Sequence, residues 1–92
     1  MIIDGPCLSA CTLVLSLLPR DKVCATPFGL FGFHSAWYKE EGEVRFAKEA
    51  TRLIWNMYPR DVQKRLVDLN WTGDEHPEMI YVQAQTMVNR CD

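Results

Sequence analysis

A serine near the start of the chain has the surroundings of a nucleophile. Ser9 lies within Gly5–Thr12, where turn residues give way to a long apolar run. This order predicts a strand, a turn and then a helix, so that Ser9 stands where backbone N–H groups are unpaired and the helix dipole is positive. The N–H of Ala10 can bind an oxyanion in such a place. The alternative is an ordinary N-cap serine, because serine is a preferred cap residue.

A histidine further along the chain is a candidate general base. His34 closes the aromatic and apolar segment Leu30–His34, which predicts a buried strand. An imidazole changes charge near neutral pH and can accept the proton of a serine hydroxyl. The alternative for His34 is a hydrogen-bonded residue of the core or of a sheet edge. The other histidine, His76, follows a polar loop and is interpreted as a solvated residue.

The chain also contains four cysteines: Cys7, Cys11, Cys24 and Cys91. Four cysteines can form two disulfides in three different pairings. Bridges between Cys7 and Cys24, Cys11 and Cys24, or Cys7 and Cys91 are all conceivable. For Cys11 we favour a buried, unpaired apolar residue. The absence of a CxxC motif disfavours zinc ribbons and thioredoxin motifs. A metal site made by Cys7, Cys11 and His34 is kept as an outside alternative, and no other metal or cofactor is expected.

The first half of the chain predicts strands around one helix. Ile2-Ile3 is an apolar stub typical of a strand end, and Val23–Thr26 predicts a second strand before a proline. Between them, Ser9–Leu18 is apolar on all sides, which predicts a buried helix. Leu30–His34 follows as a buried strand, and Lys39–Glu43 is interpreted as a charged loop.

The second half predicts helices. A helix that stops before Pro59 is indicated by apolar residues at helical spacing: Phe46, Ala50, Leu53, Ile54 and Met57. Pro59 can begin another helix whose apolar face is Val62, Leu66 and Leu69. After Pro77, helical spacing recurs at Ile80, Ala84, Met87 and Val88. A short strand at Met79–Val82 before that helix is the alternative. The fold class is therefore α/β.

Composition narrows the function classes. With 92 residues the chain forms one domain, 1–92, and its apolar content of 48% rules out a disordered protein. The net charge of −2 gives no basic patch for nucleic acid. No apolar run approaches the ~20 residues of a membrane helix, and no signal peptide is visible at the start of the chain.

The spacing of these motifs resembles that of a known family. The segments Gly5–Thr12, Val23–Pro27 and Gly32–His34 resemble the catalytic core of the Clp protease proteolytic subunit. More closely, most of the chain resembles a group of uncharacterised, predicted periplasmic proteins of that fold, which share these segments, the Met57–Pro59 helix break and a terminal cysteine, here Cys91. The resemblance implies a partial ClpP/crotonase-like fold, with a strand–helix–strand–strand core followed by C-terminal helices.

The same resemblance assigns roles to residues. Ser9 and His34 are separated by the family's spacing of twenty-five residues, and they correspond to its nucleophile and its general base. The N–H of Ala10 corresponds to one oxyanion donor. The family's acid is not matched, because Gln83 stands at its offset; Glu78 is the proposed replacement, and a dyad without an acid is the alternative. The implied activity is that of a serine hydrolase acting on a peptide substrate.

Two expectations concern the context of the chain. The glycine-rich loop that supplies the family's other oxyanion donor precedes the serine, so the sequence resembles the C-terminal part of a larger domain. The second expectation is a non-catalytic oligomerisation module that keeps only the fold, because the family assembles into rings and the chain is rich in aromatic residues such as Trp37, Trp55 and Trp71. In either case self-association and a periplasmic or exported location are expected.

Overall fold

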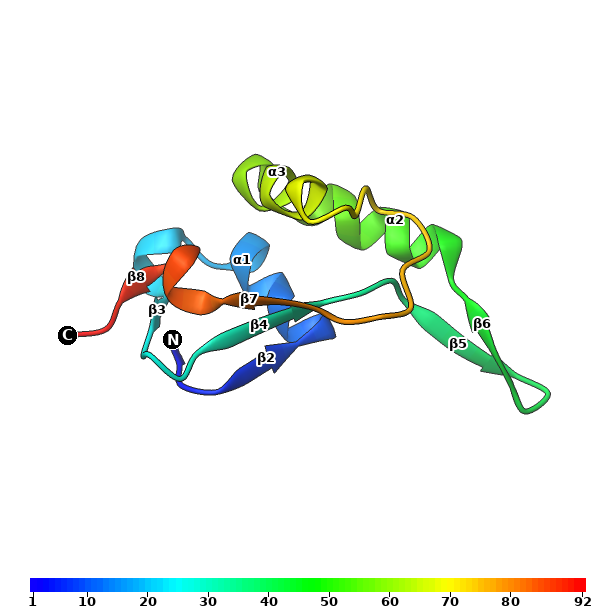
Figure 1. Ribbon diagram of the computed structural model, residues 1–92, viewed down its shortest axis with the longest axis horizontal. Helices are drawn as coiled ribbons and strands as arrows, with labels where there is room; N and C mark the ends of the chain where they lie inside the picture. The colour runs from blue at the N-terminus through cyan, green and yellow to red at the C-terminus, as the bar shows by residue number, and fades with distance from the viewer. The chain divides into compact units, whose positions relative to one another are not determined.

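The computed structural model describes all residues 1–92 and divides the chain into two compact units (Figure 1). The first unit consists of Met1–Phe33 and Met79–Asp92, and the second unit is His34–Glu78. The chain is a small mixed α/β domain with three α-helices and three small sheets, so the predicted α/β class is confirmed.

The first unit contains two three-stranded sheets. One is parallel throughout and has the strand order β1(Ile2–Ile3), β3(Cys24–Ala25), β8(Asn89–Arg90). The other has the order β2(Pro6–Leu8), β4(Leu30–Phe33), β7(Ile80–Gln83), with β2 parallel and β7 antiparallel to β4. The predicted strands at Ile2-Ile3, Val23–Thr26 and Leu30–His34 are therefore confirmed.

The predicted buried helix at Ser9–Leu18 is partly wrong. The segment forms a 3-10 helix, η1(Ser9–Leu13), followed by one α-helical turn, α1(Val14–Leu17), and a second 3-10 turn, η2(Arg20–Lys22). Val14 and Leu15 are buried, but Leu17 is 67% exposed. A segment that is apolar on every side can bury only the sides that meet the sheet, and Pro19 ends the helix before another turn can form.

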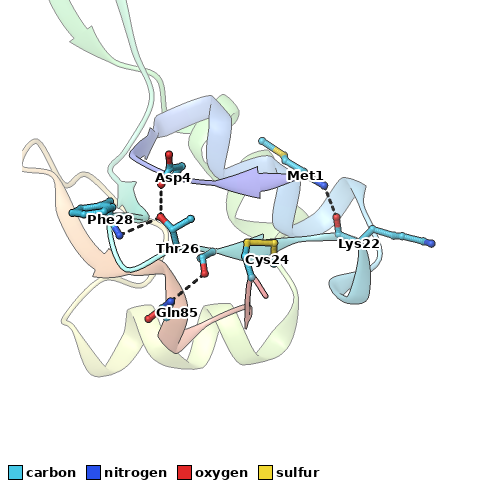
Figure 2. Close-up of a disulfide and its surroundings, with 9 residues drawn as sticks. Met1, Asp4, Lys22, Cys24, Thr26, Phe28 and Gln85 are labelled. Atoms are coloured by element: carbon cyan, nitrogen blue, oxygen red, sulfur yellow. Dashed lines mark hydrogen bonds between the residues drawn. A yellow bond between two sulfur atoms is a disulfide. The ribbon is translucent and has the colours of Figure 1, made fainter.

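A disulfide and several local hydrogen bonds stabilise the β1–β3–β8 sheet (Figure 2). Cys24 on β3 is bonded to Cys91, which follows β8. Gln85 Nε2 donates to the carbonyl of Ala25 at 3.1 Å. Thr26 Oγ1 donates to Asp4 Oδ1 at 2.5 Å and accepts from the N–H of Phe28 at 3.2 Å, which fixes the turn after β3.

The helix predicted after Pro77 is wrong, and the alternative strand is confirmed. The chain forms β7, then the 3-10 turn η3(Ala84–Thr86), and then β8. Val82 is 3% exposed and Tyr81 is 59% exposed, so burial alternates with a period of two. Pairing with β4 outweighs the helical spacing of the apolar residues.

The second unit begins with a hairpin where a loop was predicted. Strands β5(Trp37–Glu40) and β6(Glu43–Phe46) pair antiparallel, and Trp37 packs against Phe46 with ring centroids 5.8 Å apart. The two turn residues both have positive φ, 50° for Glu41 and 81° for Gly42, as a type I′ turn requires. The predicted Lys39–Glu43 loop is thus a tight turn with its flanking strand ends.

Two helices complete the second unit, as predicted: α2(Lys48–Met57) and α3(Arg60–Asp68), with Pro59 at the N-cap of α3. The predicted inward residues Val62 and Leu66 are fully buried on α3. On α2 the predicted face is wrong: Thr51 and Trp55 are buried, whereas Leu53 is 64% exposed.

The core of the second unit is built on tryptophan. Trp71 is fully buried and packs edge-on against Trp55, with ring centroids 5.2 Å apart. Its indole Nε1 donates to the carbonyl of Asp74 at 2.8 Å. Gly73 has φ 82°, and a Cβ at this position would lie 2.6 Å from Trp55 Cγ. Only glycine allows the backbone to pass so close to this ring.

Candidate functional site

Ser9 lies at a sharp turn between a strand and a helix. It follows β2 directly and is the first residue of η1, with a φ of 56°. A positive φ is uncommon for a serine and marks a backbone held in place by its surroundings. The N-cap position is taken by Leu8, so the alternative of an ordinary N-cap serine does not describe this turn.

The turn is fixed from both sides. Thr12 is fully buried, and its Oγ1 donates to the carbonyl of Ser9 at 2.5 Å. On the strand side, Cys7 pairs with Phe31 and Leu8 with Gly32 in the parallel β2–β4 pair. Ser9 therefore stands at the carboxyl end of a parallel strand, which is where sites form in α/β sheets.

Ala10 follows in the first turn of η1 and is exposed. The first N–H groups of a helix have no acceptor within that helix and carry its positive end. Ala10 directly follows Ser9 in the chain, and its N–H as an oxyanion donor stays a prediction. No second oxyanion donor is assigned.

His34 is the first residue of the second unit and is half-buried. Its Nδ1 makes a hydrogen bond with the carbonyl of Ser35, the next residue. Because a carbonyl oxygen can only accept, Nδ1 carries the hydrogen and Nε2 of the neutral ring is the acceptor. This is the tautomer that a general base needs.

The carbonyl that orients His34 belongs to a fixed piece of backbone. Ser35 is fully buried, and its N–H donates to the carbonyl of His76 at 3.2 Å. Its hydroxyl donates to the same carbonyl and accepts from the N–H of His76, both at 2.9 Å. Ser35 was not predicted from the sequence, because the group that bonds to His34 is a backbone carbonyl and every residue type has one.

Glu78 is exposed, and its backbone carbonyl accepts a hydrogen bond from His76 Nδ1 at 2.7 Å. The group that the structure places on His34 Nδ1 is the Ser35 carbonyl, so the Glu78 carboxylate as third triad member stays a prediction. Ser9 and Ala10 lie in the first unit, and His34 and Glu78 lie in the second. The pairing of Ser9 with His34 also stays a prediction.

All four cysteines are bonded, in pairs that differ from the three suggested bridges. Cys7 is bonded to Cys11, and Cys24 is bonded to Cys91. Cys11 is exposed and paired, so its interpretation as a buried free residue is wrong. The turn at Ser9 brings the Cα atoms of Cys7 and Cys11 to 5.2 Å, well within the range for a disulfide.

The disulfides also bear on the metal alternative and on the compartment. The alternative of a metal site made by Cys7, Cys11 and His34 is wrong for the disulfide-bonded chain, because the sulfur atoms of Cys7 and Cys11 are bonded to each other. No group of three or more potential ligands could hold a metal ion. Two disulfides in so short a chain are consistent with an extracellular or otherwise oxidising compartment. None of the helices has the length and apolar character needed to cross a membrane.

Two hollows lie in the second unit beside the hairpin. One, of about 380 Å³, is lined by Tyr38, Phe46, Ala47, Lys48, Glu49 and Ala50. The other, of about 400 Å³, is lined by Trp37, Val44 and Pro77. The sequence did not indicate either hollow, because the hairpin that borders both was interpreted as a loop.

No protein-family model, no curated protein and no solved structure matches this chain. The family resemblance of the motifs around Ser9 and His34 therefore stays an expectation.

Proposed function

We propose that the chain is a serine hydrolase of peptidase type with a partial ClpP/crotonase-like fold, in which Ser9 is the nucleophile and His34 is the general base. The observation that carries this proposal is the backbone at Ser9: a strand, a non-glycine residue with φ 56°, and a helix. The same succession presents the nucleophile in hydrolases with a nucleophile elbow, where the serine is exposed and the next N–H binds the oxyanion.

The register of the sheet supports the pairing with His34. Because β2 and β4 are parallel and Leu8 pairs with Gly32, their carboxyl ends lie at the same edge of the sheet. Ser9 follows the end of β2, and His34 follows the end of β4 directly in the chain. In the proposed reaction, Ser9 Oγ attacks the substrate carbonyl carbon and His34 Nε2 takes the hydroxyl proton.

The remaining steps follow the serine hydrolase pattern. The N–H of Ala10 donates to the oxyanion, and His34 returns the proton to the departing amine as the C–N bond breaks. Water then cleaves the acyl–Ser9 ester with His34 again as the base. The Ser35 carbonyl takes the orienting role that an acid plays in a triad, since it holds the hydrogen on Nδ1.

The test is covalent labelling of the chain by a fluorophosphonate probe, read out by mass spectrometry of the modified peptide. We expect the label on Ser9 and none on a Ser9→Ala variant. Ser16→Ala is the matched control, because Ser16 lies in the same unit and its hydroxyl donates to the carbonyl of Leu13 at 2.9 Å. Equal labelling of the parent and the Ser9→Ala variant would refute the proposal.

The role of His34 has its own matched pair. His34→Gln is expected to slow labelling by about 10²–10⁴, the usual contribution of a general base. His76→Gln is the control, because the Nδ1 of His76 is also hydrogen-bonded to a backbone carbonyl, at 2.7 Å. If both substitutions slow labelling equally, His34 is not the base.

A non-catalytic interaction module that self-associates is the second candidate. The observation that favours it is the exposed apolar surface of the second unit, where Leu53 is 64%, Val44 62%, Tyr38 46% and Met57 38% exposed. Such exposed apolar side chains are available to be buried against a second copy of the chain. A sedimentation coefficient that rises with concentration would support this candidate, and one that stays constant for a folded monomer would contradict it.

We further propose a periplasmic or exported location, which is supported by the two disulfides and by the resemblance to predicted periplasmic proteins.

A further inference from the structure

The two disulfides hold different parts of the first unit. The Cys24–Cys91 bridge joins residues 67 positions apart, whereas the Cys7–Cys11 bridge joins residues 4 positions apart and encloses Ser9. One end of the short bridge lies on β2 and the other lies on η1. The short bridge therefore closes a small ring around the turn that carries Ser9.

This ring constrains a backbone conformation that serine does not favour by itself. The φ of Ser9 is 56°, in the left-handed region. Cys7 is anchored because it pairs with Phe31 of β4, so the bond from Cys7 also fixes the position of Cys11. When that bond is broken, Ser9 can relax toward negative φ against the hydroxyl bond from Thr12 to its carbonyl. The position of Ser9 Oγ then changes.

The short bridge is also the more accessible of the two. Cys11 is exposed, although its partner Cys7 is only 3% exposed. Both Cys24 and Cys91 are half-buried. Thiol–disulfide exchange requires an incoming thiolate to reach one of the sulfur atoms, so an exposed half-cystine favours reaction.

We propose that the Cys7–Cys11 bridge is a site of thiol–disulfide exchange with a dithiol, and that its reduction switches off the chemistry of Ser9. A thiolate of the dithiol attacks Sγ of Cys11, the bond to Cys7 breaks, and Cys7 leaves as a thiolate that takes up a proton. The second thiol of the dithiol then attacks the mixed disulfide and releases Cys11. Two electrons pass from the dithiol, which becomes a disulfide, to the two cysteines of the chain.

This inference rests on the proposed function and adds the regulation of the same serine. The test is a titration of the intact chain with dithiothreitol, followed by alkylation and peptide mapping at each step. Fluorophosphonate labelling of Ser9 and the amide NMR signals of Ser9 and Ala10 are recorded on the same samples. We expect Cys7 and Cys11 to be alkylated before Cys24 and Cys91. We expect labelling to fall by about 10²-fold with that first step, since a displacement of about 1 Å costs that much.

Two variants separate the effects of the bridges. A Cys7→Ser/Cys11→Ser double variant is expected to have the low labelling rate and the shifted Ser9 amide signal without any reductant. A Cys24→Ser/Cys91→Ser double variant is expected to keep the parent's labelling rate and its response to dithiothreitol. Should the second variant fail to fold, the order of alkylation in the parent still decides the question.

The outcomes distinguish the regulation from the activity. Reduction of Cys24–Cys91 before or together with Cys7–Cys11 would overturn the inference. So would selective reduction that leaves both the labelling rate and the Ser9 amide signal unchanged, and in that case the proposed hydrolase would stand. If no labelling occurs in either redox state, the proposed hydrolase fails. The alkylation order and the amide signals then still decide whether the bridge controls the turn.

Discussion

The two disulfides should differ strongly in how much they stabilise the fold. The perturbation is the replacement of each pair by serine, Cys24→Ser/Cys91→Ser in one variant and Cys7→Ser/Cys11→Ser in the other. Both variants lose the same chemical groups from the same unit, and the largest difference between them is the length of the loop that each bond closes. Those loops correspond to sequence separations of 67 and 4 residues.

The expected magnitudes follow from the entropy of the unfolded chain. A bond stabilises the native state by restricting the unfolded state, and the effect grows with the logarithm of loop length. For these separations the loss is about 4.4 kcal/mol without Cys24–Cys91 and about 2 kcal/mol without Cys7–Cys11. Loss of the short bridge also lets Ser9 relax from its φ of 56°, so the stability lost without Cys7–Cys11 is smaller still.

The assay is equilibrium unfolding in urea, followed by tryptophan fluorescence and by circular dichroism. With a slope of about 1 kcal/mol per molar urea, a difference of about 2.4 kcal/mol separates the two midpoints by about 2 M. In thermal unfolding the same difference corresponds to about 10–20 °C. A short-bridge variant that is as unstable as the long-bridge variant, or less stable, would refute the reasoning.

Three further predictions concern packing and hydrogen bonds. Gly73→Ala should lower the free energy of unfolding by more than about 2 kcal/mol, because its Cβ would lie 2.6 Å from Trp55 Cγ. Gly5→Ala is the control, because its Cβ would meet nothing within 4 Å, and its effect should stay within about 0.5 kcal/mol. Equal urea midpoints for the two variants would contradict this prediction. Ser35→Ala should lower the free energy of unfolding by about 1–3 kcal/mol and slow the labelling of Ser9, because the buried hydroxyl bonds to both backbone groups of His76. An unchanged labelling rate would show that Ser35 does not help to orient His34. Thr12→Val keeps the shape of the side chain but removes the hydrogen bond to the Ser9 carbonyl. We expect the free energy of unfolding to fall by about 1 kcal/mol and the amide signal of Ser9 to shift. An unmoved signal would show that Thr12 does not hold the turn.

Local patterns in the sequence were sufficient for the elements whose signals are strong. Pro59 marks the start of α3, and the apolar runs at Cys24–Ala25 and Leu30–Phe33 form strands as predicted. The sequence failed where pairing between distant segments decides the outcome. Ile80, Ala84, Met87 and Val88 have helical spacing, yet the segment begins with a strand, as the stated alternative had it, because β4 offers Ile80–Gln83 a partner.

The candidate site was predictable in the same uneven way. The sequence indicated that Ser9 lies between a strand and a helix, and the structure agrees. It could not indicate that the Ser35 carbonyl orients His34, because a main-chain atom has no signature in the sequence. The Cys7–Cys11 bond was missed because the expected order of strand, turn and helix does not reveal that the turn brings the two Cα atoms to 5.2 Å.

The connection between β4 and β7 has a consequence for the order of folding. Phe33 pairs with Ile80 at the end of this antiparallel pair, and the whole second unit lies between them in the chain. The second unit is therefore an insertion at the tip of a hairpin, a place where extra chain disturbs the host least. During synthesis the insertion has all its own residues before the first unit does, because β7, β8 and Cys91 are translated after it. The first unit can thus complete its two sheets only after β7 and β8 have been synthesised, and the second unit can fold before that.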